Sequence, residues 1–571
     1  GNYNTVVGDE AGTAITTGIK NTLIGSLTGD ALTDADFNVA VGQSALSADT
    51  LGSRSVAIGS SALASQNFTS ATDAFNTAVG HVAGYAITTG VQNTLIGGLA
   101  GDAITTANNN TAVGQAALSA TTTGGSNVAI ATNALGSNTT GGANVAIGQD
   151  ALFNNTTASN NTAVGHNALV ANTTGAENVA VGRLALQANT TGATNTALGA
   201  VSLYGNTTGA SNVAVGDNAL QGNTTASFNT AVGRQALALN TTGASNTAVG
   251  YQTLYSNTTA NFNSATGHFS LKLNTTGSEN AGFGAYSLQS NTTGGSNTAV
   301  GYQALDANTT ASNNTAVGRN ALVANTTGTQ NVAVGSLAGD AMTTGAKNTA
   351  LGHGSLGADT TGVENTALGT GAGERITTGS DNICIGYVSG SHNVYLAAGT
   401  GNTIIGSYAD VTTADSDFAN VIGYNVSGGA GYTTLGNASS DIRAVHGNVT
   451  WATVSDQRYK KDIVDSTAGL SFINALQPRT FKYKTLGELP ETFSAYKADS
   501  TKVFKNSDTN HGFIAQEVKA AIDADSSIAD GFKLWDERDD GSMEVAEAAL
   551  IPVLVKAIQE LTARLETLEG E

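Results

Sequence analysis

The sequence predicts a mainly β protein, with a long parallel β-solenoid followed by a small α/β domain that ends in a coiled coil. Three observations support this prediction. A 17-residue repeat fills most of the chain and is poor in residues that favour helices. The last fifth of the chain holds more than half of the charged residues and all three prolines. Apolar residues near the carboxyl end are spaced alternately by three and four, as in a heptad repeat.

The repeat can be compared copy by copy. Copies begin at Asn4 and at every seventeenth residue to Ser55, and again from Asn76 to Asn382, which gives 23 copies. The step from Ser55 to Asn76 is 21 residues, an insertion of four. Position one is Asn and position five is nearly always Gly. Positions two and four carry Thr, Val, Ile or Leu, position three is commonly Ala, and Ala-Leu often precedes a polar Asn-Thr-Thr-Gly stretch.

This pattern predicts one solenoid coil per copy. Side chains alternate between the faces of a strand, so positions two and four share one face and Ala and Gly share the other. Asn and Gly favour turns because they tolerate positive φ. A leucine-rich repeat would be longer, and the Gly-Gly-x-Gly-x-Asp motif of a calcium-binding solenoid is missing. Stacked at about 4.8 Å, the coils would form a rod about 110 Å long.

The coil composition also predicts an oligomer. A coil of Ala, Val and Thr has little interior of its own, and its small-residue face suits close approach to another chain. Solenoids gain stability from stacked interfaces. We therefore expect a homotrimer whose shaft is trimeric along its length.

The repeat resembles the head repeat of trimeric bacterial autotransporter adhesins, and "RSVAIG" at Arg54 to Gly59 is the copy most similar to it. The resemblance covers residues 4 to about 392 and implies a left-handed parallel β-roll. The Asn-Thr-Thr triplets also match the N-glycosylation pattern. Because Asn and Thr are so frequent, stacked asparagines in turns are the simpler interpretation.

Charge and composition argue against several functions. The net charge of −20 argues against nucleic-acid binding, which needs a basic surface. No apolar run approaches the roughly 18 residues of a membrane-spanning helix, so we expect no membrane insertion. We expect no signal peptide, because the repeat begins at Asn4. The single Cys384 excludes a disulfide framework.

The period ends after Asn382. We interpret residues 1–392 as the shaft, 393–454 as an irregular β collar, and 455–571 as a mixed α/β domain. In that domain "FINALQPRTFKYK" predicts a helix end followed by a strand. "HGFIAQEVKAAI" predicts a strand or turn that continues as a helix.

The end of the chain predicts a trimerising coiled coil from about residue 551. Pro552 must lie in the first turn of this helix or kink it. A single amphipathic helix packed on its own domain would also show one apolar stripe. The predicted seam consists of Ile551, Leu554, Ile558, Leu561, Leu565 and Leu568.

Four motifs near the carboxyl end are "VSDQRYKKDI", "LQPRTFKYK", "HGFIAQEV" and "LIPVLVKAIQEL". In this order they resemble the endosialidase-type intramolecular chaperone domain, which ends many phage tail fibres and tailspikes. The resemblance implies a domain that assists folding and then cleaves itself off. The self-cleavage motif of that family, Ser-Asp-x-Arg-x-Lys, is met by Ser455, Asp456, Arg458 and Lys460.

The resemblance implies that Ser455 is the nucleophile and Lys460 the base, with Asp456 and Arg458 in supporting roles. Serine needs a base to remove its proton, and a buried lysine with a lowered pKa can serve as that base. A spacing of five suits neither a straight strand nor one helix face, so a turn or the neighbouring subunit must close the gap. This single-turnover cleavage is the only enzymatic activity that we expect.

Other candidate groups are interpreted as structural. His511 has no matching role in the resemblance, and the acidic cluster from Asp536 to Glu544 is more simply a solvated loop than an ion site. We therefore expect no metal and no cofactor.

The predicted function is that of a homotrimeric viral tail fibre, located on the virion, that attaches to a host-cell receptor or glycan. One alternative is a tailspike that binds or degrades polysaccharide. Degradation would need paired carboxylates and aromatic sugar platforms, but the only tryptophans, Trp451 and Trp535, lie outside the repeats. Another alternative is a trimeric adhesin on a bacterial surface.

Overall fold

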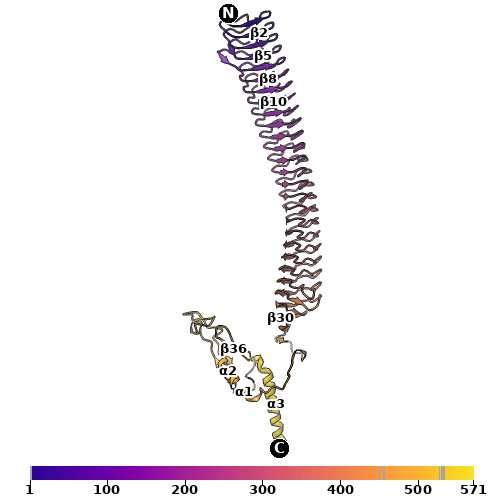
Figure 1. The fold of residues 1–571 in the computed structure, drawn as a ribbon, viewed down its shortest axis with the longest axis vertical. Coiled ribbons are helices and arrows are strands. Elements are labelled where there is room, and N and C mark those ends of the chain that lie inside the picture. The colour runs from indigo at the N-terminus through magenta and orange to yellow at the C-terminus, as the bar shows by residue number, and fades with distance from the viewer. Residues whose placement is uncertain (1–2, 449–450, 454–456, 526–527, 529–533, 571) are drawn as a thin grey trace. The chain divides into compact units, whose positions relative to one another are not determined.

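The computed structural model describes residues 3–448, 451–453, 457–525, 528 and 534–570. The chain divides into two compact units, Gly1–Val454 and Ser455–Glu571, each of which has its own hydrophobic core. Within the first unit, Figure 1 shows short strands stacked coil upon coil from the indigo N-terminal end to the region of β30. Among the described residues, no helix is both long and apolar enough to cross a membrane.

The first unit is a parallel β-solenoid, as predicted. Each regular strand pairs with the strand 17 residues later, as Ala180 does with Ala197. The stacked strands are β1 (Thr5–Val7), β2 (Thr22–Ile24), β3 (Val39–Val41), β5 (Val56–Ile58), β7 (Thr77–Val79), β8 (Thr94–Ile96), β9 (Thr111–Val113), β10 (Val128–Ile130), β11 (Val145–Ile147), β12 (Thr162–Val164), β13 (Val179–Val181), β14 (Thr196–Leu198), β15 (Val213–Val215), β16 (Thr230–Val232), β17 (Thr247–Val249), β18 (Ser264–Thr266), β19 (Ala281–Phe283), β20 (Thr298–Val300), β21 (Thr315–Val317), β22 (Val332–Val334), β23 (Thr349–Leu351), β24 (Thr366–Leu368), β25 (Ile383–Ile385), β26 (Thr403–Ile405), β28 (Asn420–Tyr424) and β30 (Tyr432–Asn437).

Each coil encloses a narrow core. In the coil that begins at Asn178, positions one, three, eight, nine and twelve are fully buried. These residues are Asn178, Ala180, Ala185, Leu186 and Asn189. The same five positions are buried in most other coils, so the core is a set of continuous columns parallel to the rod axis. Stacking in this way lets short apolar side chains bury surface that no single coil could hide.

The expectation that a coil has little interior of its own is wrong. The Ala strand face points into the coil, where Ala180 is inaccessible to solvent. The opposite face, with Val179 at position two and Val181 at position four, points outward and is partly exposed. The small-residue face is therefore used within one chain and cannot contact another.

Asparagine ladders run through the interior. The side-chain oxygen of Asn178 accepts a hydrogen bond of 2.9 Å from the backbone N–H of Asn195 in the next coil. In a second ladder, Nδ2 of Asn189 donates to Oδ1 of Asn172 at 2.9 Å and to the carbonyl of Gly192 at 2.9 Å. These bonds satisfy polar groups that burial would otherwise leave unpaired. Asn172 and Asn189 begin Asn-Thr-Thr triplets and are buried, so the folded shaft offers no glycosylation site there.

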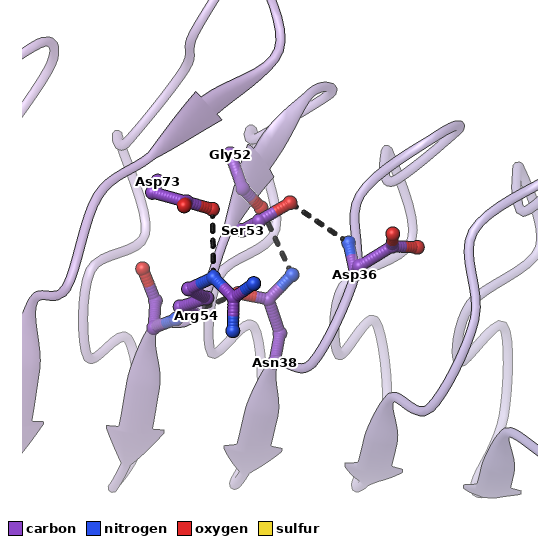
Figure 2. Close-up of polar contacts among 7 residues, drawn as sticks. Asp36, Asn38, Gly52, Ser53, Arg54 and Asp73 are labelled. Atoms are coloured by element: carbon purple, nitrogen blue, oxygen red, sulfur yellow. Dashed lines mark hydrogen bonds and ion pairs between the residues drawn. The ribbon is translucent and has the colours of Figure 1, made fainter.

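The four-residue insertion is accommodated by a local pair of strands. The strands β4 (Gly52–Ser53) and β6 (Thr72–Asp73) pair in parallel beside the main stack. Figure 2 shows Arg54 Nε donating to Asp73 Oδ1 at 2.9 Å, while the Ser53 hydroxyl accepts from the Asp36 N–H at 2.9 Å. These contacts hold the enlarged coil against its neighbours, so the regular register resumes at β7.

The parallel stack continues through most of the expected collar. From β25 the offset between paired strands is 20 residues to β26, 17 to β28 and 13 to β30, so the strict period is lost. A side pair forms between β27 (Asp410–Val411) and β29 (Ser427–Gly428). The sheet then turns antiparallel through β31 (Ser440–Val445) and β32 (Ala452–Thr453).

The second unit is a small α/β domain, as predicted. Its helices are α1 (Leu470–Ala475), α2 (Ala515–Ala524) and α3 (Leu550–Glu569), with 3-10 turns η1 (Gln457–Tyr459), η2 (Leu486–Glu488) and η3 (Glu547–Ala549). Its strands are β33 (Arg479–Phe481), β34 (Asn510–Gly512), β35 (Trp535–Glu537) and β36 (Met543–Val545). The predicted order of helix then strand, and strand then helix, is confirmed by α1 with β33 and by β34 with α2.

Candidate functional site

The predicted cleavage segment lies where the second unit begins. Ser455 and Asp456 fall outside the described residues. The remaining two motif residues lie at η1, where Arg458 is part of the 3-10 turn and Lys460 follows it. The backbone N–H of Lys460 donates to the carbonyl of Gln457 at 3.0 Å, which closes this turn. Both basic side chains are exposed in the single chain, so the single chain does not enclose the predicted base.

Helix α3 divides its apolar residues between two faces. Leu550, Val553 and Ala557 are buried in the core of the second unit, where α3 packs against α1. Glu560 continues this inner face, because its carboxylate accepts the Leu470 N–H of α1 at 2.9 Å. Pro552 lies in the first turn, where its missing N–H breaks no intrahelical bond, as predicted.

The predicted heptad seam lies on an adjacent stripe of α3. All six of its residues are exposed, and in Leu568 the exposed fraction reaches 74%. The alternative in which this stripe packs on its own domain is therefore wrong, because the domain buries a different stripe. The seam residues are Ile551, Leu554, Ile558, Leu561, Leu565 and Leu568. Val555, also exposed, widens this apolar face.

An ion pair connects the two motifs that surround the core of the second unit. Arg479 on β33 donates two hydrogen bonds, of 2.9 and 2.8 Å, to the carboxylate of Glu517 on α2. This bidentate pair lowers the pKa of Glu517 from its usual range. It links the "LQPRTFKYK" and "HGFIAQEV" segments in the fold, which gives their joint occurrence a structural reason.

The acidic cluster from Asp536 to Glu544 forms the hairpin of β35 and β36. Asp540 accepts hydrogen bonds from Ser494 N–H at 2.9 Å and from the Ser542 hydroxyl at 2.6 Å. These donors lower its pKa well below the usual range. The described residues contain no group of three or more His, Cys, Asp or Glu side chains that could hold a metal ion.

His511 is exposed on β34 and lines an open hollow of about 730 Å³. In the register of β34, His511 lies opposite Thr480 on β33. Aromatic side chains form much of the wall, among them Phe481, Phe493 and Phe504.

Several ionisable groups are buried in the solenoid. Burial raises the pKa of Asp49 and of Asp410 above the usual range, and it raises the pKa of Cys384 to about 12. The thiol of Cys384 is fully buried, so it behaves as a small core residue without nucleophilic reactivity.

One surface feature of the shaft was missed by the sequence analysis. Aromatic rings from consecutive coils contact one another at positions six and seven, between Tyr251 and Tyr302. The sequence does contain the signal, because aromatic residues recur there at multiples of 17. Comparing the variable positions of the repeat, as well as its constant ones, would have found it.

Comparison with known proteins supports the interpretation of the second unit. Residues 455–525 match the family model described as "Chaperone of endosialidase". The matched stretch contains the "SDQRYKKDI", "LQPRTFKYK" and "HGFIAQEV" motifs. No curated protein and no solved structure matches the chain.

Proposed function

We propose that this chain is the shaft and folding domain of a homotrimeric viral fibre that attaches to host cells. In this proposal the C-terminal unit trimerises, sets the register of the solenoid and then releases itself by cleavage. The main observation behind this proposal is that the apolar seam of α3, from Ile551 to Leu568, is exposed, although the same helix already buries a second apolar stripe in its own domain. The match of residues 455–525 to an endosialidase chaperone supports a folding role for the same unit.

Association would cover the seam. Full burial of a Leu or Ile side chain contributes about 1.5–3 kcal/mol, so six seam residues per chain supply a substantial driving force. The heptad places Ile551 and Ile558 at a positions, and Leu554 and Leu561 at d positions. This combination by itself favours a coiled coil of two helices. Val555 adds an e position, which suits a bundle of more helices. The number three comes from the resemblance of the C-terminal motifs.

The outward strand face of the solenoid is the proposed contact between shafts. Its position-four side chains form an apolar column that is partly exposed over the whole length of the rod. Its exposed members include Ile24, Ile58, Ile96, Ile130, Ile147, Leu198, Val249, Phe283, Val300, Leu351 and Leu368. Packing three such columns together would remove this surface from water.

A template at one end would solve a register problem. Because every coil is nearly identical, three chains could pair with one coil slipped, and non-local β pairing is slow to nucleate. Joining the chains at α3 raises their effective concentration, to the millimolar range for short linkers. The coils nearest the C-terminal unit would then associate first, in the correct register.

Self-cleavage would make assembly irreversible. Lys460, as a neutral amine, would take the proton of the Ser455 hydroxyl while the oxygen attacks the adjacent peptide carbonyl. The proton would pass to the departing amine, and one water molecule would then hydrolyse the ester to a carboxylate. Because the single chain leaves Lys460 exposed, we propose that a neighbouring subunit encloses it. Loss of the template leaves the shaft stable for kinetic reasons.

The decisive experiment measures the purified full-length product by intact mass and by native mass. We expect two fragments, of about 454 and 117 residues, with the larger one held as a trimer. Introducing Ile147→Asp on the strand face should break the trimer, whereas Thr140→Asp on an exposed turn should not. A monomeric product with an intact chain would refute the proposal.

A further inference from the structure

We propose that an aromatic ladder on the shaft is a binding site for an acidic polysaccharide. The ladder comprises five rings from four consecutive coils, namely Tyr251, His268, Phe269, Tyr286 and Tyr302. This inference deepens the proposed attachment role and rests on it for its biological purpose. Its test has a separate readout.

The rings form one continuous surface. Tyr251 stacks on His268 with centroids 5.5 Å apart and planes at 21°, and His268 lies 3.9 Å from Phe269. The Tyr286 ring packs edge-on against His268 and Phe269, with centroid distances of 5.4 and 5.7 Å. The Tyr302 ring packs edge-on against Tyr286, with centroids 5.9 Å apart. Offset and edge-on contacts are the favoured arrangements of aromatic pairs, so the rings hold one another in place.

The solenoid core does not require these rings. They occupy positions six and seven, outside the buried columns, where many other coils carry Gln, Ser or Asn. The side chain of Tyr302 is 49% exposed and His268 is also exposed. Tyr251, Phe269 and Tyr286 are half-buried. Gathered aromatic surface that is partly open to solvent marks an interaction site.

Cations surround the ladder. Arg234 lies with its guanidinium 5.9 Å from the Tyr251 centroid, and Lys272 Nζ lies 4.1 Å above Phe269. Arg319 occupies position six in the coil after Tyr302, and it is exposed. Arg234 Nε also lies 3.6 Å from Asp217 Oδ2. Because both side chains are largely exposed, this ion pair is weak and leaves Arg234 able to bind a ligand.

The placement of charge points to an anionic ligand that follows the rod axis. Arg234 and Arg319 lie in one column five coils apart, a span on the order of 24 Å at about 4.8 Å per coil. The net charge of the chain is −20, but salt screens distant charges beyond about 8 Å, so the nearby cations dominate.

Carbohydrate fits this surface better than nucleic acid does. A pyranose ring has an apolar C–H face that can lie on an aromatic ring, and a polar rim that can reach the flanking amides and cations. The coil spacing is close to the length of one sugar residue in a linear polysaccharide. Bases also stack on aromatic rings, but nucleic acid needs a continuous basic groove along its backbone, and only three cations are present here.

The test uses a hexasaccharide of β-1,4-linked glucuronate, with cellohexaose as a neutral control of the same linkage. Binding to the full-length protein is followed by saturation-transfer NMR. We expect a Kd on the order of 1 mM for hexaglucuronate and binding about tenfold weaker for cellohexaose. Tyr286→Ala should weaken hexaglucuronate binding about tenfold or more. Combined Arg234→Gln and Arg319→Gln should reduce it to the cellohexaose level.

Tyr204→Ala is the matched control, because Tyr204 is an exposed tyrosine of the shaft that lies outside the ladder. It should leave binding unchanged. The proposal is overturned if hexaglucuronate fails to bind, if Tyr286→Ala binds it as well as the parent, or if hexathymidylate binds more tightly. Loss of the parent oligomer in Tyr286→Ala, seen by native mass, would also overturn it, because the rings would then be a subunit contact. Binding by an uncleaved monomer would refute only the proposed function.

Discussion

The carboxylate of Asp359 accepts a hydrogen bond of 2.8 Å from the backbone N–H of Gly362, inside the solenoid and away from solvent. In the central coils the same position carries Asn, which forms the second buried ladder. The neighbouring coils place Met342 and Ile376 there, and both are buried. Burial between these apolar residues raises the pKa of Asp359 to about 6.

Asp359 should therefore make the shaft less stable at neutral pH. A carboxyl group whose pKa is raised by folding contributes most to stability below its unfolded pKa of about 4. This contribution falls as pH rises from about 4 to about 6, and stays low above that. At pH 7 the cost is up to about 3 kcal/mol, so Asp359→Asn should raise the free energy of unfolding by about that amount.

Denaturant unfolding of the parent and Asp359→Asn at pH 4 and at pH 7 checks this expectation. The two proteins should differ at pH 7 and be similar at pH 4. Asp9→Asn, at an exposed position, is the control and should have no effect. Equal stability of the parent and Asp359→Asn at both pH values would contradict the conclusion that burial raises the pKa of Asp359.

Gly182 should not tolerate alanine. Its φ is +137°, and an added Cβ would lie 2.4 Å from the carbonyl oxygen of Gly199 in the next coil. The backbone strain alone costs about 1–3 kcal/mol, and the clash adds to it. Gly182→Ala should lower the melting temperature by several degrees, whereas Gly98→Ala, with no atom within 4 Å of its added Cβ, should not. Matching melting curves for the two variants would show that close stacking at position five is unimportant.

Leu561→Asp tests the seam of α3. The charge would lie among apolar residues of the neighbouring helices, where burial without a partner is costly. We expect aggregated or monomeric product by size-exclusion chromatography and native mass. Gln559→Asp, exposed on α3 but outside the seam, should assemble normally. Soluble, native-sized oligomers from Leu561→Asp would rule out the proposal that association through α3 sets the register of the shaft.

Ser455→Ala and Lys460→Ala should both leave the chain intact while still allowing it to fold and associate. Folding depends on α3 and the domain surface, whereas cleavage needs only the activated hydroxyl. Lys460→Arg should also block cleavage, because a guanidinium does not lose its proton near neutral pH. Denaturing gels and intact mass report the cleavage, and native mass reports assembly. If Ser455→Ala were still cut at the same bond without added protease, self-processing would be refuted.

Much of the architecture follows from local sequence patterns. The 17-residue period predicted parallel coils, since each copy has room for one short strand and its turns. In the second unit, the apolar spacing from Ile551 predicted the exposed stripe of α3, and Pro552 lies in the first turn of that helix, as expected. The buried stripe of Leu550, Val553 and Ala557 was not predicted. The seam was predicted from this apolar spacing, and the cleavage residues from the resemblance of the motifs. Ser455 and Asp456 lie outside the described residues. The roles of all these residues stay predictions.

The sequence by itself determined the period, the alternation within each strand and the apolar spacing of α3, because these depend on residues close together in the chain. It could not show which strand face is inside, because that depends on how the whole coil closes. Leu203 and Leu220 illustrate the same limit, since both are buried with φ of 50°, in the left-handed region. That conformation costs an isolated L-residue about 1–2 kcal/mol. Only the stacked coils make it favourable, because they bury the leucine and bond its backbone, as the Leu203 N–H does with the Ala219 carbonyl at 2.9 Å.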